Sequence, residues 1–202
     1  CDIWPVDTVA TTGNGTSGIF AWGAQLEAAN FATSYIPTVG GTVLRSPDVA
    51  SMTGTNFSSW FNASAGTFVS SFDVIGSATA ATRRHVWNGD DATNQRLSLR
   101  ALDTATNAPI AAIGTGAAVT SLNGTALTVN VPASIAVAYG SNMALSQNGA
   151  TPVTSASAAS VSISSLDIGG NIAATLFLNG HIRHIVYFNS RLPNAQLQAL
   201  TA

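Results

Sequence analysis

The sequence predicts an all-β fold, in which two antiparallel sheets pack as a sandwich and one short helix follows at the C-terminal end. Three observations support this prediction. Apolar and polar residues alternate over many short segments, and Gly, Asn, Asp or Pro separate those segments. Almost no segment has helical periodicity. Short strands with closely spaced turns are typical of β-sandwiches.

The expected strands follow one another through most of the chain. In residues 68–75 the even-numbered positions share one face of a strand and the odd-numbered positions share the other. In residues 96–101, Leu and Ala alternate with Arg and Ser, which predicts an apolar inner face and a polar outer face. Similar alternation marks residues 127–131, 135–139, 143–145 and 180–189. Gln-Asn-Gly at 147–149 gives the clearest hairpin turn of the chain.

The C-terminal end of the chain is expected to form the last strand and the only helix. Strict alternation in the strand places Ile182, His184, Val186 and Phe188 on one face and Arg183, Ile185 and Tyr187 on the other. His181 and His184 would then lie on opposite faces, so they could not bind one metal ion together. After the strand, Pro193 and Asn194 can open a helix with Leu197 and Leu200 on one face.

Residues 40–47 are expected to separate two regions. We predict that residues 1–44 contain the closing strands and the junction of a preceding β-domain, because they are too few to form a domain alone. Residues 45–202 then form the sandwich. The sequence has no initiator Met and no signal-peptide pattern, so we expect it to be the trailing part of a longer polypeptide. Cys1 is the only cysteine, so no disulfide can form within the chain.

The composition excludes several kinds of partner. The chain is 46% hydrophobic and only 8% charged, which argues against a disordered chain. All seven basic residues are arginines and the formal net charge is -2, so the cluster of cations that nucleic-acid binding requires is absent. The apolar runs are far shorter than the roughly 20 residues that span a bilayer, and no membrane insertion is expected.

The densest group of polar and aromatic residues lies at 87–96, between two expected strands. An indole face can stack on a pyranose ring while Asp and Asn side chains bind its hydroxyl groups. The pattern therefore predicts a glycan-binding loop, with the candidate ligand residues Trp87, Asn88, Asp90, Asp91, Asn94 and Arg96. The alternative is an ordinary turn with Trp87 in the core, because Asn, Gly and Asp are common turn residues.

Neither a metal ion nor a catalytic group is expected. Asp90 and Asp91 with Asn88 and Asn94 could offer oxygens to Ca²⁺, but their spacing matches no calcium loop, so no cofactor is predicted. Glycoside hydrolysis requires two carboxyl groups about 5–10 Å apart, and acidic residues are few. A pair of aspartates that meet only in the folded chain is left open. We therefore predict that the chain acts by contact and not by catalysis.

Two parts of the sequence resemble parts of known proteins. Residues 21–28 (Ala-Trp-Gly-Ala-Gln-Leu-Glu-Ala), 32–38 (Ala-Thr-Ser-Tyr-Ile-Pro-Thr) and 45–48 (Arg-Ser-Pro-Asp) resemble a junction in phage tail and prophage fibre proteins. There it ends a carbohydrate-binding-module-like jelly roll. Residues 178–188, followed by 191–192 and 197–201, resemble the closing strand and terminal helix of concanavalin A-like, or laminin-G-like, domains in the same proteins. The resemblance implies a jelly-roll sandwich on a virion surface.

The function that this resemblance implies is a virion attachment or structural module of a phage tail or fibre. Its expected partners are host-surface polysaccharide, other virion proteins and further copies of the same chain, for which a trimer is the implied assembly. Two alternatives stay open: a carbohydrate-binding domain of a secreted polysaccharide-degrading enzyme, and a tail depolymerase. The fold cannot decide among them, because one fold hosts many functions.

Overall fold

A computed structural model describes residues 20, 22–27, 34–45, 48–75, 83–90, 95–102, 108–115, 118–156, 160–171 and 176–202. By its internal contacts the chain divides into two compact units, Cys1–Arg45 and Ser46–Ala202. The described residues of the first unit, in 20–45, contain no strand or helix. The second unit holds the sandwich.

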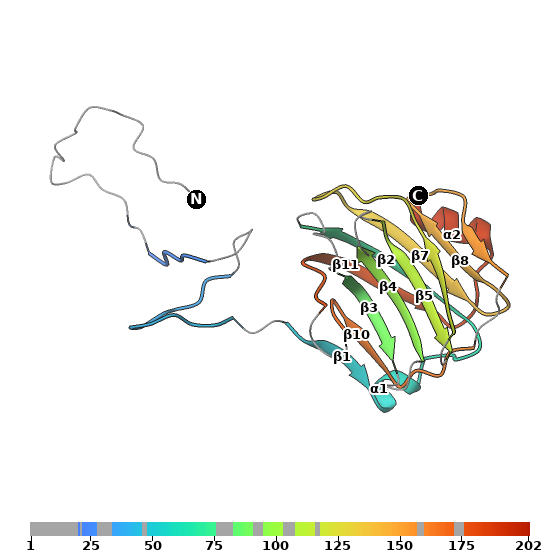
Figure 1. Cartoon of the computed structure of the whole chain (residues 1–202), viewed down its shortest axis with the longest axis horizontal. Coiled ribbons are helices and arrows are strands. Elements are labelled where there is room, and N and C mark those ends of the chain that lie inside the picture. The colour runs from blue at the N-terminus through green and yellow to red at the C-terminus, as the bar shows by residue number, and fades with distance from the viewer. Residues whose placement is uncertain are drawn as a thin grey trace. The chain divides into compact units, whose positions relative to one another are not determined.

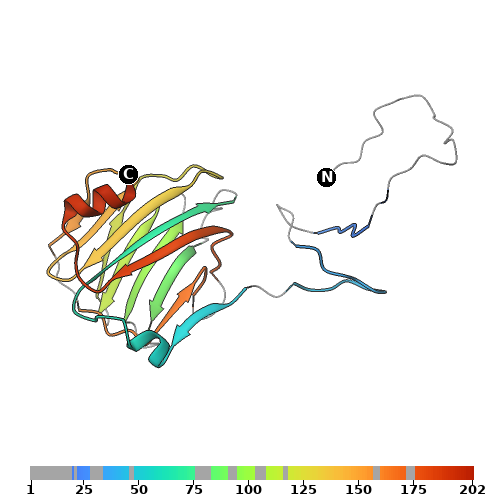
Figure 2. The ribbon, with the colours of Figure 1, turned by 180° about the vertical axis from the view of Figure 1, so that it is seen from behind.

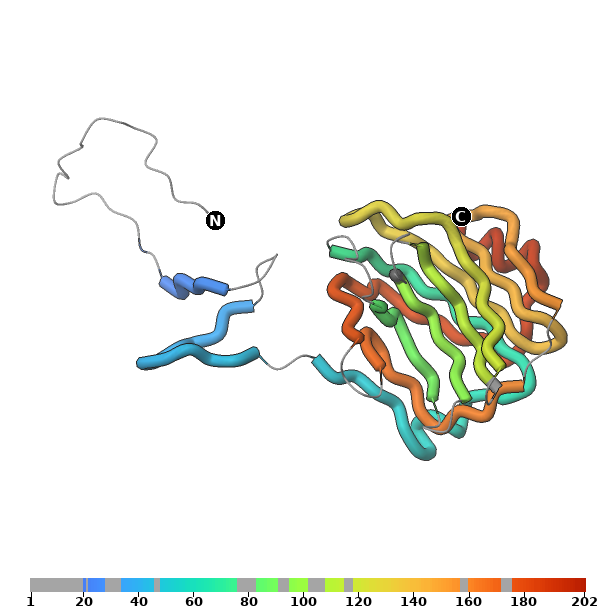
Figure 3. Tube along the Cα trace, viewed as in Figure 1, coloured from blue at the N-terminus to red at the C-terminus, as the bar shows by residue number. Residues whose placement is uncertain are grey.

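One sheet of the sandwich has six strands among the described residues, and every neighbouring pair is antiparallel. In order across the sheet they are β1 (Ala50–Thr53), β10 (Ser165–Ile168), β3 (Arg84–Asp90), β4 (Arg96–Leu102), β5 (Ile110–Thr115) and β6 (Ala118–Asn123). This sheet lies toward the viewer in Figure 1. Strand β10 comes from late in the chain and lies between β1 and β3, as the tube in Figure 3 also shows.

The second sheet has five strands in the described part of the chain, again all antiparallel. In order they are β11 (Gly180–Phe188), β2 (Gly66–Val74), β7 (Ala133–Tyr139), β8 (Met143–Gln147) and β9 (Val153–Ser155). Two helices are described, the four-residue α1 (Thr55–Ser58) and α2 (Asn194–Thr201). Neither is long and apolar enough to cross a membrane. The predicted two-sheet antiparallel sandwich with a short C-terminal helix is confirmed, and α1 is an addition to it.

The core lies between the two sheets and follows the alternation predicted from the sequence. In β2 the even-numbered apolar residues Phe68, Phe72 and Val74 are buried in it, and in β4 Leu97 and Leu99 meet them from the other sheet. The strand expected at 127–131 does not form. Asn130 there has a φ of 61° and lies in a turn, which breaks the extended backbone that a strand needs.

Strand β11 departs from strict alternation because it contains a β-bulge. Its pairing with β2 shifts between Ile182 and His184, so that Arg183 is the extra residue. As a result Ile182 packs on the core with Ile185, on the face that the sequence pattern had assigned to Arg183. The bulge also places both histidines on the outer face, because His181 pairs with Asp73 and His184 with Ser71. The prediction that His181 and His184 lie on opposite faces is wrong.

Helix α2 covers part of the outer face of the five-stranded sheet, as seen from behind in Figure 2. Leu197 is fully buried against a small apolar cluster, Val69, Ala136, Ala138 and Ala144. At the helix end, the Thr201 hydroxyl accepts a 3.1 Å hydrogen bond from the Gly149 backbone N–H of the β8–β9 hairpin. Leu200 is 45% exposed, so Leu197 alone anchors the predicted apolar face of the helix.

Candidate functional site

Trp87, the proposed sugar platform, is a core residue. Its side chain is 0% exposed, and its ring stacks on Phe68 with the ring centroids 4.4 Å apart. Its indole Nε1 donates a 3.0 Å hydrogen bond to the Ser70 Oγ. No ring face is open to a ligand, so the predicted stacking role of Trp87 is corrected and the turn-and-core alternative is right about this residue.

The polar residues next to Trp87 lie in strand β3, where the sequence analysis expected a loop. Because Trp87 points into the core, Asn88 and Asp90 alternate onto the outer face of the six-stranded sheet. Cross-strand pairing extends this face in both directions. Asn88 lies between Asp167 of β10 and Ser98 of β4, and Asp90 pairs with Arg96. We call Asn88, Asp90, Arg96, Ser98 and Asp167 the polar face.

The residues of the polar face are buried to different extents. Asn88 and Ser98 are 4% and 0% exposed, whereas Asp90, Arg96 and Asp167 are half-buried. Among the described residues, three buried atoms of this face have no hydrogen-bond partner: Arg96 Nε, Ser98 Oγ and Asp167 Oδ2. Most buried polar groups in proteins are paired with protein groups or ordered water, so these unpaired atoms on one face require an explanation.

The charges of the polar face are close enough to affect one another. Burial raises the pKa of Asp167, and the nearby charge of Asp90 raises it further. The two carboxyl groups are diagonal neighbours, because Asp167 pairs with Asn88 while Asp90 pairs with Ser165. The Asp90 backbone oxygen also accepts a 3.2 Å hydrogen bond from the Ser164 N–H, which holds the end of β3 beside β10. Two aspartates that are 77 positions apart in the sequence are thus fixed on one surface.

The remaining candidate ligands give no further support. Asp91 and Asn94 lie outside the described residues. In the part of the chain that the structure describes, no group of three or more His, Cys, Asp or Glu side chains could hold a metal ion. The prediction that Asn88, Asp90, Asp91, Asn94 and Arg96 bind a glycan is not tested and stays a prediction. Ser98 and Asp167 were missed as members of the same face.

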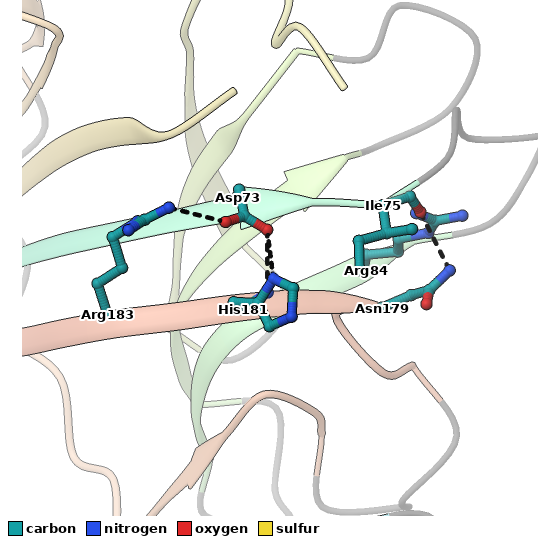
Figure 4. Close-up of polar contacts among 6 residues, drawn as sticks. All are labelled: Asp73, Ile75, Arg84, Asn179, His181 and Arg183. Carbon is teal, nitrogen blue, oxygen red and sulfur yellow. Dashed lines mark hydrogen bonds and ion pairs between the residues drawn. The ribbon is translucent and has the colours of Figure 1, made fainter. Parts of the chain in front are cut away.

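Asp73 is more deeply buried than Asp167 and belongs to the five-stranded sheet. Figure 4 shows its carboxylate between Arg183 and His181, both on β11. His181 Nδ1 lies 2.9 Å from one carboxylate oxygen, and Arg183 donates a 3.2 Å hydrogen bond to the other. Burial acts to raise the pKa of Asp73, but the hydrogen bonds from the side chain and backbone of His181, with the charges of His181 and Arg183, lower it below its usual value. Asp73 therefore fastens the bulge of β11 to β2.

Figure 4 also shows two hydrogen bonds to the backbone oxygen of Ile75, just after the end of β2. Arg84 of β3 donates a 3.0 Å hydrogen bond to the Ile75 backbone oxygen, and Asn179 donates one of 3.1 Å to the same atom. Asn179 has a φ of 51°, in the left-handed region that suits a turn into β11. Both carboxylate oxygens of Asp73 and the backbone oxygen of Ile75 have hydrogen-bond partners, so we interpret this cluster as structural.

Comparisons with solved structures identify similar sandwiches in carbohydrate-binding proteins. The CBM40 domain of the Ruminococcus gnavus sialidase bound to α2,3-sialyllactose matches with a TM-score of 0.59 at 14% identity, over 73% of this chain and 88% of that one. The NanB sialidase of Streptococcus pneumoniae matches with a TM-score of 0.58 at 12% identity, over 74% of this chain and 26% of that one. The binding domain of botulinum neurotoxin DC, in complex with SialylT, matches with a TM-score of 0.57 at 10% identity, over 74% and 38%.

At these identities the likeness shows the fold, a jelly-roll β-sandwich like those of carbohydrate-binding domains. No family model and no curated protein matches the sequence. The resemblance to phage tail and fibre proteins and to laminin-G-like domains therefore stays a prediction.

Proposed function

We propose that the unit from Ser46 to Ala202 binds carbohydrate through the polar face of its six-stranded sheet. The observation that carries this proposal is the set of unpaired buried atoms, Arg96 Nε, Ser98 Oγ and Asp167 Oδ2, on one surface. The similarity of the fold to structures solved with sialyllactose supports it. Among the alternatives from the sequence, the carbohydrate-binding domain is thus favoured over the virion module as the statement of function.

The side chains of the polar face suit the hydroxyl groups of a sugar. Each sugar hydroxyl both donates and accepts hydrogen bonds, and the face offers carboxylate acceptors in Asp90 and Asp167 and a cationic donor in Arg96. Asn88 adds an amide that does both. Arg96 also matches the carboxylate of an acidic sugar, so sialylated glycans are the first class to test.

We also propose that binding proceeds without catalysis and without a cofactor. Asp90 and Asp167 lie on one face, which the sequence alone did not show, yet the CBM40 structures that the fold resembles are binding domains. If this proposal holds, the isolated chain releases no reducing ends from a polysaccharide that it binds. If the wild-type chain released reducing ends and Asp167→Asn did not, the chain would be a depolymerase and this proposal would be wrong.

The virion setting remains a further proposal, supported by the junction-like segment of the first unit. Its described residues contact one another: Trp22 packs edge-on against Tyr35 with ring centroids 5.6 Å apart, and the Gln25 side chain accepts a 2.7 Å hydrogen bond from the Ile36 N–H. In that setting, copies of the chain would present weak sites many times over, and multivalency would raise their combined affinity for host polysaccharide. Electron microscopy of purified particles labelled with an antibody to this chain would test the location.

The prediction for the polar face is that Arg96→Ala weakens glycan binding by roughly tenfold to a hundredfold. A hydrogen bond to a charged group contributes about 1.5–3 kcal/mol, and each 1.4 kcal/mol is a factor of about ten in Kd. The measurement is an array of sialylated and neutral glycans, followed by calorimetric titration with the strongest ligand. Arg183→Ala is the matched control, because Arg183 is 53% exposed on the other sheet. Equal loss in both variants would place the binding site elsewhere.

A further inference from the structure

A small hollow opens beside the polar face, at the edge where β1 meets β10. Its space, including the mouth, is about 290 Å³. Four of its lining residues bear on ligand binding: Asp48, just before β1, Asp167 in β10, and Asn171 and Phe177, which follow β10. Asp167 also belongs to the polar face, so the hollow and the polar face share this residue. That space includes open solvent in front of the hollow, so a ligand would lie against its wall and not inside an enclosed cavity.

The fold holds Phe177 in place on both sides. Leu176 donates a 2.9 Å backbone hydrogen bond to the Asn171 Oδ1, and Leu178 donates one of 2.9 Å to the Gly169 oxygen. Gly169 in turn donates a 2.8 Å bond to Val86 of β3, and its φ of 73° permits the turn after β10. The Phe177 ring is half-buried, and Gly170 lies against one part of it. The aromatic side chain is therefore preorganised at the wall of the hollow.

The chemistry of the hollow is the combination that the sequence analysis sought around Trp87. An aromatic ring can pack against the C–H groups of a pyranose, and carboxylates beside it accept hydrogen bonds from the sugar hydroxyls. Here Phe177 supplies the ring, and the two acidic residues that line the hollow are Asp48, just before β1, and Asp167 in the neighbouring strand β10. The Asp167 Oδ2 is buried and has no hydrogen-bond partner among the described residues, so a rotation of this side chain toward the hollow would pair it with a sugar hydroxyl.

We propose that this hollow is a second sugar subsite, which takes a pyranose ring on Phe177 next to the sugar unit bound by the polar face. This inference rests on the proposed function. It narrows the ligand class to oligosaccharides of at least two units, because a single sugar cannot occupy both places. Affinity then depends on Phe177 only for ligands long enough to reach the hollow.

The test measures Kd for 3′-sialyllactose and for N-acetylneuraminic acid alone, by calorimetric or NMR titration of the whole chain. Phe177→Leu keeps the apolar volume but removes the aromatic face. Since aromatic contacts contribute about 0.5–1.5 kcal/mol beyond area burial, the trisaccharide should bind about two- to tenfold more weakly, with the monosaccharide unchanged. Phe177→Tyr should retain the affinity, and Asp48→Ala should lose part of it.

Phe188→Leu is the matched control, because Phe188 is also half-buried but lies on the outer face of the other sheet. A trisaccharide affinity that is the same in Phe177→Leu and wild type, while Arg96→Ala abolishes it, would overturn the second subsite and leave the proposed function standing. A wild-type chain that binds neither ligand nor any other glycan of the array would overturn both. Thermal unfolding of each variant checks that the fold is retained, and the exposed Asp48 provides the second reading if Phe177→Leu is unstable.

Discussion

Replacing Trp87 with alanine is expected to lower the free energy of unfolding by about 3–5 kcal/mol, the usual loss for a fully buried large aromatic side chain. The substitution empties a site that is 0% exposed and removes the stacking on Phe68. It also leaves the Ser70 hydroxyl without the donor that it has in Trp87 Nε1. Urea unfolding followed by circular dichroism measures the change.

Trp87→Phe is the control for this prediction. It keeps an aromatic ring beside Phe68 but removes the hydrogen bond to Ser70, so its loss should be clearly smaller than that of the alanine variant. Glycan affinity per folded molecule should stay unchanged in Trp87→Phe. If Trp87→Ala instead abolished glycan binding and left the unfolding transition in place, Trp87 would be a ligand platform after all.

The alternating strands were predictable because their signal is local. In β4, Leu97, Leu99 and Ala101 alternate with polar residues, and in β2 the inward positions are apolar except for Ser70. An apolar inner face produces that pattern whatever the rest of the fold does. The same reasoning failed for strand β3, part of which was predicted to be a loop. Asn-Gly-Asp at 88–90 is a common turn sequence, but here Gly89 lies within β3 on its inner face, where a Cβ would meet the Ile163 side chain. Its neighbours Asn88 and Asp90 lie on the outer face of the sheet, where polar residues are as common as in turns, so their polarity could not distinguish a strand from a turn.

The parts of the site that could not be predicted depend on pairing between distant segments. Nothing near Asp167 in the sequence indicates that β10 inserts between β1 and β3 and brings it beside Asn88. Phe177 reaches the same edge for the same reason. The β-bulge at Arg183 is likewise a property of the β11–β2 pair, and it moves His181 and His184 onto one face without any change in their spacing.

Asp73 and Asp167 should respond in opposite ways when each is replaced by asparagine. Asp73→Asn is expected to lower the free energy of unfolding at pH 7 by about 1.5–3 kcal/mol, because it removes charged hydrogen bonds with His181 and Arg183. Asp167→Asn is expected to raise it by about 0.5–2 kcal/mol, because it removes the charge of a half-buried carboxylate that has one buried, unpaired oxygen and a like charge nearby. Urea unfolding of both variants at a series of pH values measures the two effects.

The pH dependence separates the two causes. The pKa of Asp73 is lowered in the folded chain from 3.8, so its contribution to stability is present above pH 3.8 and is lost as the pH falls through the lower folded pKa. The pKa of Asp167 is raised from 3.8, so its penalty is absent below pH 3.8 and grows as the pH rises through the folded pKa. Both differences from wild type should therefore vanish in acid. If the Asp167 carboxylate lowers stability at neutral pH, its role under the proposed function is to bind the glycan. Asp167→Asn should therefore weaken glycan binding while it stabilises the fold. Destabilisation by Asp167→Asn would instead make Asp167 a structural residue and remove it from the polar face as a ligand.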